Sequence, residues 1–337
     1  MKIKVWIGII ISALFIWLAF RKIDFSQLVF TIKSANYIYL LPAIGVTFFQ
    51  FFLRAVRWGY ILEPVKKIST YSLFSSTMIG FMANNILPAR IGEFVKAYSL
   101  GKKENLRFSA SFATIVIERI LDVFALLVVM LVVLSIITLP SDKAETEQLI
   151  RKGGALITFA FLGLLIFLYY FKQNKDFVTK IVFNAVKLLS LKLAEKIHDF
   201  LEAFASGLSV LQKGKHVLLT LLYSLLIWFI SAIPVYFILL SFGYVLPFSI
   251  ALFILLVIAL AVAVPSAPGF IGTFHFACAL GLELFNIPEE KALSVAIVIH
   301  AVNFFPVTLA GLLFLWKEKI SLSDAEALEE SSEVIKC

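Results

Sequence analysis

The sequence predicts an all-α, polytopic membrane protein with about six spanning helices and two proline-broken re-entrant hairpins, which enter the membrane and return. Three observations support this fold class. Hydrophobic residues make up 61% of the 337 residues, and the mean hydropathy is +0.97, whereas soluble domains are about 45–50% apolar. Apolar runs long enough to cross a bilayer recur along the chain, and proline-containing turns follow two of them. If the hairpins span fully, the number of crossings is eight or more.

Loop charges orient these apolar segments. The segments lie near residues 5–20, 37–53, 70–87, 112–139, 155–171, 216–240, 247–264, 268–285 and 292–316. The basic stretches between them are 54–68, 90–107 and 172–215, and Lys317 and Lys319 follow the last segment. Because cytoplasmic loops carry an excess of Lys and Arg, we expect these stretches to be cytoplasmic. The uncharged loop 241–246 and the charge-balanced loop 140–152 are expected outside.

The N-terminus resembles a signal sequence but lacks its cleavage site. Two lysines precede the apolar run Val5–Phe20, and Arg21 and Lys22 follow it directly. We therefore expect an uncleaved first helix in the cell (inner) membrane, with both the N- and C-termini in the cytoplasm.

The composition also excludes several classes of partner and chemistry. A net charge of +8 would suggest nucleic acid for a soluble protein, but here the bases flank apolar runs, so no nucleic-acid partner is expected. Cys278 and Cys337 form no disulfide framework and no metal-binding spacing. The common hydrolase, metalloprotease and nucleotide-binding signatures are absent. We therefore expect no catalytic residues, no metal and no cofactor.

Two stretches of the chain must enter the membrane and return. Both 54–68 and the end of 90–107 are expected in the cytoplasm, so the chain between them has to turn back at Asn84–Pro88, where proline disfavours helix. By the same logic 247–290 enters from outside and turns at Pro265–Gly269.

The two hairpins resemble each other in sequence. Shifting the chain by 180 residues places Pro88–Gly101 over Pro268–Gly281, and seven of the fourteen positions agree, including one Pro and two Gly. Repeat units of about 37–139 and 216–316 would then have opposite orientations. An inverted-topology repeat is typical of transporters with a binding site near the bilayer midplane.

These segments predict one integral membrane domain over 1–317. Within it, 176–213 has apolar residues at helical spacing between charged ones. It is expected to form an amphipathic cytoplasmic helix, lying either on the bilayer or on the helix bundle. Residues 318–337 form a short acidic tail.

We call the two turns at Asn84–Pro88 and Pro265–Gly269 the first and the second break. The first polar cluster surrounds the first break and consists of Asn84, Asn85, Arg90 and Glu93. A half-helix beginning after Pro88 would point its free N–H groups and positive dipole end toward the midplane. Arg90 adds a guanidinium suited to phosphate or carboxylate. We expect an anion site, and the alternative is a structural Arg90–Glu93 pair.

The second cluster, Glu118, Arg119 and Asp122, lies at the start of a long apolar run and carries a net charge of −1. It therefore needs a partner base, for which the candidates are Arg54, Arg57 and Arg90. Its role is either packing or the coupling of protons or cations.

The third cluster comprises the Pro268–Gly269 turn with Gly272, Thr273 and His275, together with His300 and Asn303 of the last helix. The glycines permit close backbone approach. The two histidines form either a proton relay or ordinary hydrogen bonds.

Three motifs in this order resemble the lysylphosphatidylglycerol synthase transmembrane (flippase-like) family: Asn84–Glu93, Glu118–Asp122 and Pro265–Gly272. The resemblance covers about residues 5–316 and implies a stand-alone membrane module without the soluble aminoacyltransferase domain. In multidomain members this module resembles the part that moves aminoacylated lipid between leaflets, and other members accompany polyprenyl-linked sugar pathways. The positions that the resemblance implies for substrate binding are Asn84, Pro88, Arg90, Gly92, Glu93, Glu118, Arg119, Asp122, Pro268, Gly269 and Gly272.

The leading functional hypothesis is therefore a flippase that moves an anionic or lipid-linked substrate, of the phospholipid or polyprenyl-phosphate type, between leaflets. The alternatives are a non-catalytic membrane partner that recruits a separately encoded synthase or glycosyltransferase through 176–213, and an intramembrane enzyme that acts on a lipid-linked substrate.

Overall fold

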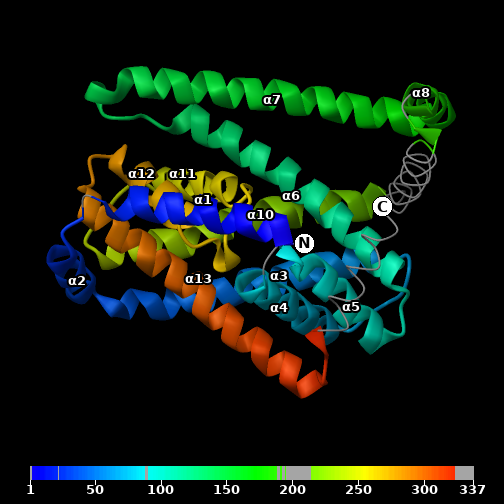
Figure 1. Cartoon of the computed structure of the whole chain (residues 1–337), viewed down its shortest axis with the longest axis horizontal. Helices are drawn as coiled ribbons and strands as arrows, with labels where there is room; N and C mark the ends of the chain where they lie inside the picture. Colours follow the sequence, from blue (N-terminus) through cyan, green and yellow to red (C-terminus); the bar gives the residue numbers. More distant parts are fainter. Residues whose placement is uncertain are drawn as a thin grey trace.

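The computed structural model describes residues 2–21, 23–87, 90–187, 190, 191, 194 and 214–322, and within these ranges its regular structure is entirely helical (Figure 1). The helices are α1 (Lys2–Phe20), α2 (Phe25–Ser34), α3 (Leu40–Leu62), α4 (Thr70–Ile86), α5 (Gly92–Glu104), α6 (Phe108–Ile136), α7 (Ala144–Gln173), α8 (Lys175–Lys187), α10 (Gly214–Ser241), α11 (Phe248–Ala261), α12 (Thr273–Glu283) and α13 (Glu289–Glu318). Short 3-10 turns are η1 (Tyr37–Tyr39), η3 (Ser141–Lys143) and η5 (Pro268–Phe270).

Four helical segments of the described part are long and apolar enough to cross a membrane: Tyr37–Leu62, Phe108–Ile136, Leu218–Ser241 and Glu289–Glu318. Gly8–Phe20 and α11 are apolar but shorter. The outward sides of the long helices expose large apolar residues such as Leu131, Leu309 and Leu313, which suits contact with lipid. The chain is thus an all-helical, polytopic membrane protein, with four of the roughly six predicted spans meeting this criterion.

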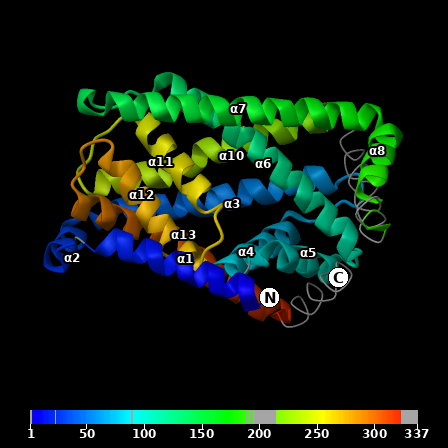
Figure 2. The same ribbon diagram turned by 45° about the horizontal axis from the view of Figure 1, so that its top comes forward.

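Helices α3 and α10 pack along each other and form the centre of the molecule. Helix α4 lies against α3, α5 and α13, and α11 lies against α10, α12 and α6. Figures 1 and 2 place α4 and α5 toward the end of the molecule where α8 lies, and α11 and α12 toward the opposite end, where α2 lies. Helix α7 runs along the outside, next to α6.

Local sequence signals set several helix ends. Asp24 caps α2 by accepting hydrogen bonds from the backbone N–H groups of Ser26 and Gln27, and Ser69 caps α4 by accepting from Ser72 N at 3.2 Å. Helix α4 ends at Ile86, and Leu87 is extended (φ −91°, ψ 146°), the conformation that a following proline favours. Pro88 itself lies outside the described residues.

The structure corrects the expected loop at 54–68. Helix α3 continues to Leu62, so Arg54 and Arg57 lie within the bundle rather than in a cytoplasmic loop. Lys96, expected in the basic stretch 90–107, is likewise buried on α5. The physical reason is pairing, because buried carboxylates from α6 hold all three bases. Exposed bases still gather at this end of the molecule, namely Lys66, Lys67, Lys102, Arg107, Lys317 and Lys319.

Two other predictions are covered in part. Helix α8 matches the start of the amphipathic stretch 176–213, and most of the remainder lies outside the described residues, as does the tail from residue 323. The predicted external loop 140–152 is shorter than expected, because α7 begins at Ala144.

Candidate functional site

A buried ion-pair network joins α3, α6 and α10. Arg57 is fully buried, and its Nη1 lies 2.6 Å from Asp122 Oδ1 while its Nη2 lies 3.4 Å from Glu118 Oε1. The same Nη1 donates to Ser224 Oγ at 2.8 Å. Because an unpaired ion is costly in a low-dielectric interior, these contacts make Arg57 the central base of the network.

Lys96 brings α5 into this network. Its Nζ lies 2.5 Å from Glu118 Oε2 and 3.9 Å from the centroid of the Trp58 ring. Trp58 in turn donates from Nε1 to Thr114 Oγ1 at 2.9 Å. Reasoning from sequence missed Lys96 because it counted the bases of 90–107 as a signal of cytoplasmic location. Helical spacing of Val95, Lys96 and Ser99, all buried on α5, was the signal that could have found it.

Asp122 receives two further bases, Arg54 at 3.5 Å and Arg119 at 3.4 Å. Arg119 also lies 3.6 Å from Glu93, Nε to Oε1. The network as a whole contains four bases (Arg54, Arg57, Lys96 and Arg119) and three carboxylates (Glu93, Glu118 and Asp122). One positive charge is therefore in excess. Two of the three expected partner bases, Arg54 and Arg57, are confirmed by these contacts.

Asn84 fastens the first break to the start of α5. Gly92 N donates to Asn84 Oδ1 at 2.8 Å, and Asn84 Nδ2 donates to Glu93 Oε2 at 3.3 Å. A Cβ atom on Gly92 would lie 2.4 Å from Asn84 Cγ and 2.1 Å from the carbonyl oxygen of Gly80. The expectation of a fully free half-helix N-terminus is thus wrong in part, since the chain's own Asn84 occupies one of its donors.

Arg90 links the two breaks. Its backbone is left-handed (φ 57°), its Nη2 donates to the carbonyl oxygen of Val264 at 3.3 Å, and its guanidinium lies 4.8 Å from the centroid of the Phe270 ring. The alternative Arg90–Glu93 pair is not formed, because the ion-pair partner of Glu93 is Arg119.

The second break approaches the first through buried glycine backbone. Gly269 (φ 68°) and Gly272 (φ 93°) adopt conformations that favour glycine. A Cβ atom on Gly269 would lie 3.2 Å from the carbonyl oxygen of Asn85, and one on Gly272 would lie 2.5 Å from that of Ser12 in α1. Asn85 itself donates from Nδ2 to Thr308 Oγ1 of α13 at 2.9 Å.

The two histidines lie behind the second break, with ring centroids 4.7 Å apart. His300 Nε2 bonds the carbonyl oxygen of Gly269 at 2.7 Å, and His275 Nδ1 accepts from Gly272 N at 3.4 Å. Thr273 and Asn303 also bond neighbouring backbone carbonyls. Each histidine therefore has the local backbone partner that a structural role requires. Among the described residues, no group of three His, Cys, Asp or Glu side chains could hold a metal ion.

A cavity of about 240 Å³ lies between the two breaks, bounded by α3, α4, α10, α11 and α13. Most of its lining is apolar or aromatic, including Phe81, Phe270 and Phe304. Its polar lining residues are Gln50, Arg54, Asn85, Trp228, Ser231, His300 and Asn303, and no described lining residue is a carboxylate. Of the predicted site residues, Asn85, Gly269, His300 and Asn303 reach this cavity.

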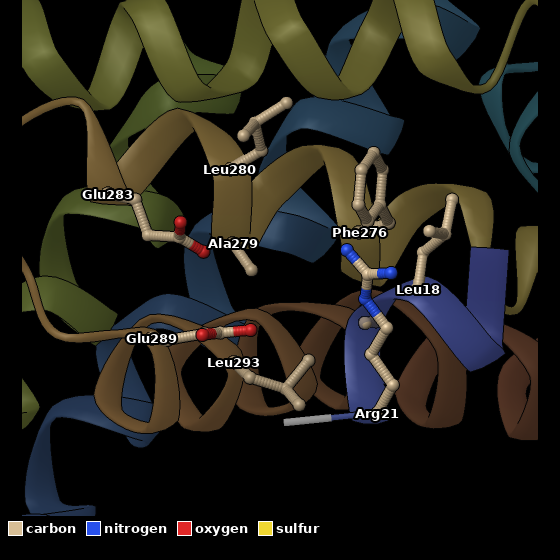
Figure 3. Close-up of a pocket in the computed structure, with 9 residues that line it drawn as sticks. Leu18, Arg21, Phe276, Ala279, Leu280, Glu283, Glu289 and Leu293 are labelled. Atoms are coloured by element: carbon tan, nitrogen blue, oxygen red, sulfur yellow. The ribbon is translucent and has the colours of Figure 1, made fainter. Parts of the chain in front are cut away.

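A second cavity of about 250 Å³ lies near the other end of the bundle, between the end of α1, α12 and the start of α13. Figure 3 shows the side chains of Arg21, Glu283 and Glu289 around it. It contains none of the residues predicted from the sequence.

Comparisons with known proteins agree with this architecture. The model of the family described as the lysylphosphatidylglycerol synthase TM region matches residues 5–311. A UPF0104 membrane protein of Methanocaldococcus jannaschii is 29% identical over 233 residues, covering 69% of this chain and 92% of that protein. One of Pyrococcus horikoshii is 26% identical over 340 residues, covering 95% and 98%.

A further relative carries an additional region. The glycosyltransferase AglD of Haloferax volcanii is 22% identical over 362 residues, which cover 99% of this chain and 57% of AglD. No solved structure matches the chain significantly.

Proposed function

The chain belongs to the lysylphosphatidylglycerol synthase transmembrane family, and from that premise we propose that it is a flippase. Its substrate would be an anionic phospholipid or a polyprenyl-phosphate-linked lipid, which it moves between leaflets. The observation that carries the proposal is the meeting of two broken helices beside one cavity. Arg90 is not among the residues that line the cavity, but it joins the two breaks by contacting both Val264 and Phe270, and Phe270 lines the cavity.

An inverted repeat of α3–α6 and α10–α13 is part of this proposal. The packing partners support it: α4 lies on α13 as α11 lies on α6, and α5 lies on α6 as α12 lies on α13. The remaining pair, α3 and α10, would be related to each other by the pseudo-twofold axis, and these two helices pack together. Transporters built from such repeats bind substrate near the midplane, at discontinuous helices.

The lengths of the inner helices favour re-entrant hairpins over full crossings. At about 1.5 Å per residue, the 14 residues of α11 extend about 21 Å and the 13 residues of α5 about 20 Å. The hydrocarbon core is about 30 Å thick. Each half-helix therefore ends inside the membrane, where its backbone groups need partners such as Asn84.

The exposed bases at one end support a cytoplasmic location for that end. Lys66 pairs with Glu104, and Lys103 pairs with Glu318 at 2.6 Å, so the loop after α3, the end of α5 and the end of α13 lie together there. In this proposal both termini of a cell-membrane protein lie in the cytoplasm. The contacts above support this for the end of α13, and the N-terminus is assigned there from the charge pattern of the sequence.

In this proposal, hydrogen-bond donors and an excess positive charge stabilise the anionic head group of the lipid during transport. A lipid head entering the cavity loses its water, and donors fixed by the helices replace it. The carboxylates of α6 hold Arg54, Arg57 and Lys96 in place, so that one excess positive charge compensates the head. The acyl chains remain in the bilayer.

Replacing Arg90 by glutamine is expected to slow transport roughly tenfold or more, because a hydrogen bond from a charged group is worth about 1.5–3 kcal/mol. The measurement is the movement of fluorescent phosphatidylglycerol between the leaflets of reconstituted vesicles. Arg107→Gln, at an exposed position, is the matched control. Arg90→Gln that transports at the wild-type rate, in protein that melts like the wild type, would remove Arg90 from the site.

The match to a glycosyltransferase favours a second candidate function. This chain aligns with 57% of AglD, so it could serve as the membrane partner of a separately encoded lipid-modifying enzyme. Recruitment through 176–213 predicts that recharging this segment abolishes function while Arg90→Gln does not. An intramembrane enzyme would instead yield a new lipid product, which mass spectrometry of the purified protein with its lipid would detect.

A further inference from the structure

The cavity between the two breaks offers hydrogen-bond donors and no negative charge. Arg54 lines it, and the Nε–H of Arg54 is buried without an acceptor in the described protein. Trp228 lines it from α10, and its indole Nε1–H is also buried without an acceptor. Because buried donors are nearly always satisfied, two orphan donors at one cavity indicate a ligand that accepts hydrogen bonds.

Gln50 adds a third donor. It is buried, and its Oε1 already accepts a hydrogen bond from Ser231 Oγ. Its amide NH2 group is therefore the end left for a ligand. With Arg54 and Trp228 it covers the side of the cavity formed by α3 and α10.

The electrostatic balance gives the sign of the ligand. The three carboxylates of the network are occupied by its four bases, and Arg54 is the base that reaches the cavity. No described lining residue is acidic, so an ammonium group entering the cavity would find no counter-ion and would face a guanidinium. Like charges in a low-dielectric site repel strongly.

We infer that the cavity binds a lipid phosphate whose negative charge is not neutralised by an amine, and that Arg54 and Trp228 select it. The aminoacylated, cationic form of such a lipid is excluded by the same two features. The apolar and aromatic remainder of the lining suits the hydrocarbon portion of a lipid next to its phosphate better than a free, fully hydrated anion. The inference rests on the proposed flippase function, whose site it refines.

Equilibrium binding to the purified full-length protein tests this choice. Native mass spectrometry would compare phosphatidylglycerol, polyprenyl phosphate, lysylphosphatidylglycerol and inorganic phosphate at equal concentrations. The expected result is at least about tenfold tighter binding of the two anionic lipids than of the cationic lipid. Equal or tighter binding of lysylphosphatidylglycerol would overturn the inference. Inorganic phosphate binding as tightly as the lipids would also overturn it, because the ligand would then be a soluble anion.

Two substitutions assign the selectivity to residues. Arg54→Gln should bring the anionic-to-cationic ratio close to one, and Trp228→Phe, which keeps an aromatic ring and removes the donor, should weaken binding of the anionic lipids severalfold. The matched controls are Arg107→Gln and Trp316→Phe, both at exposed positions. If Arg54→Gln fails to fold, Trp228→Phe still decides, since unchanged affinity there would contradict the assignment.

Failure of this inference is distinguishable from failure of the proposed function. Binding in detergent reports the choice of head group whether or not the lipid crosses a bilayer. Anionic selectivity without movement in vesicles would contradict the flippase and leave the selectivity intact. If lysylphosphatidylglycerol moved at the rate of phosphatidylglycerol, the selectivity would be contradicted and the flippase function would stand.

Discussion

Replacing Arg57 by methionine is expected to lower the free energy of unfolding by about 3–5 kcal/mol. Arg57 is fully buried and contacts both Asp122 and Glu118. Without it, Asp122 loses its shortest ion pair and Ser224 loses its donor. Glu118 would then keep only Lys96 as an ion-pair partner, and Asp122 only the longer contacts with Arg54 and Arg119. The measurement is thermal unfolding in detergent, together with the yield of monodisperse protein.

Arg107→Met is the matched control, because Arg107 is exposed at the start of α6. The double change of Arg57→Met with Asp122→Asn separates the two parts of the effect. Since it removes one carboxylate together with the base, the network keeps its excess of one positive charge and its Lys96–Glu118 pair, and the double variant should recover part of the lost stability. An Arg57→Met protein as stable as the Arg107→Met protein would contradict the role given to the network.

Gly92→Ala is expected to lower the free energy of unfolding by about 3 kcal/mol or more. Overpacking a protein interior usually costs about 1–3 kcal/mol, and this site is among the tight ones. The added methyl group would lie 2.1 Å from the carbonyl oxygen of Gly80, and backbone cannot yield as a flexible side chain does. It would also displace Asn84, which bonds the N–H of Gly92. Alanine's better helix propensity, worth about 1 kcal/mol, is too small to offset this clash. Both the melting temperature and the transport rate should fall.

Gly45→Ala is the comparison, because nothing lies within 4 Å of the corresponding Cβ position on α3. There the propensity gain acts alone, so stability should stay level or rise slightly. If Gly92→Ala and Gly45→Ala have the same melting temperature, the backbones of α4 and α5 are not in close contact at Gly80 and Gly92, and the account of this contact is contradicted.

The sequence located the helix breaks because proline and glycine leave direct marks on the backbone. Leu87 is extended before Pro88, and Gly269 and Gly272 have positive φ, as the turn residues required. The inverted repeat predicted from the sequence indicates that the two breaks meet near the midplane, but the residues that join them could not be predicted. Their contact depends on single interactions between distant residues, such as that of Arg90 with Val264.

The main wrong prediction from the sequence was the location of three bases that are buried in the structure, and the reason is physical. A count of Lys and Arg treats every base as exposed, and a base paired with a buried carboxylate breaks that assumption. Arg54, Arg57 and Lys96 looked like a cytoplasmic loop signal and instead hold Asp122 and Glu118. The Glu118–Asp122 cluster did indicate that partner bases were needed, but not that α5 would supply one of them.

Trp228 and Gln50 could not have been found from the sequence alone. Both lie in long apolar runs where an indole or an amide reads as packing. Their importance comes from what surrounds them: Trp228 has a buried donor without an acceptor, and the oxygen of Gln50 is occupied by Ser231.

The central proposal is that both helix breaks lie buried at the middle of the membrane, and thiol labelling tests it most directly. In a background with Cys278 and Cys337 replaced, single cysteines at Leu87 and Ser266 would be exposed to a membrane-impermeant maleimide on each side of sealed vesicles. Val65 and Val245, both exposed in loops at opposite ends, are the controls. We predict that Val65 and Val245 label from opposite sides and that Leu87 and Ser266 label from neither. Labelling of Leu87 or Ser266 as fast as that of either control would show an ordinary water-exposed loop and would contradict the claim.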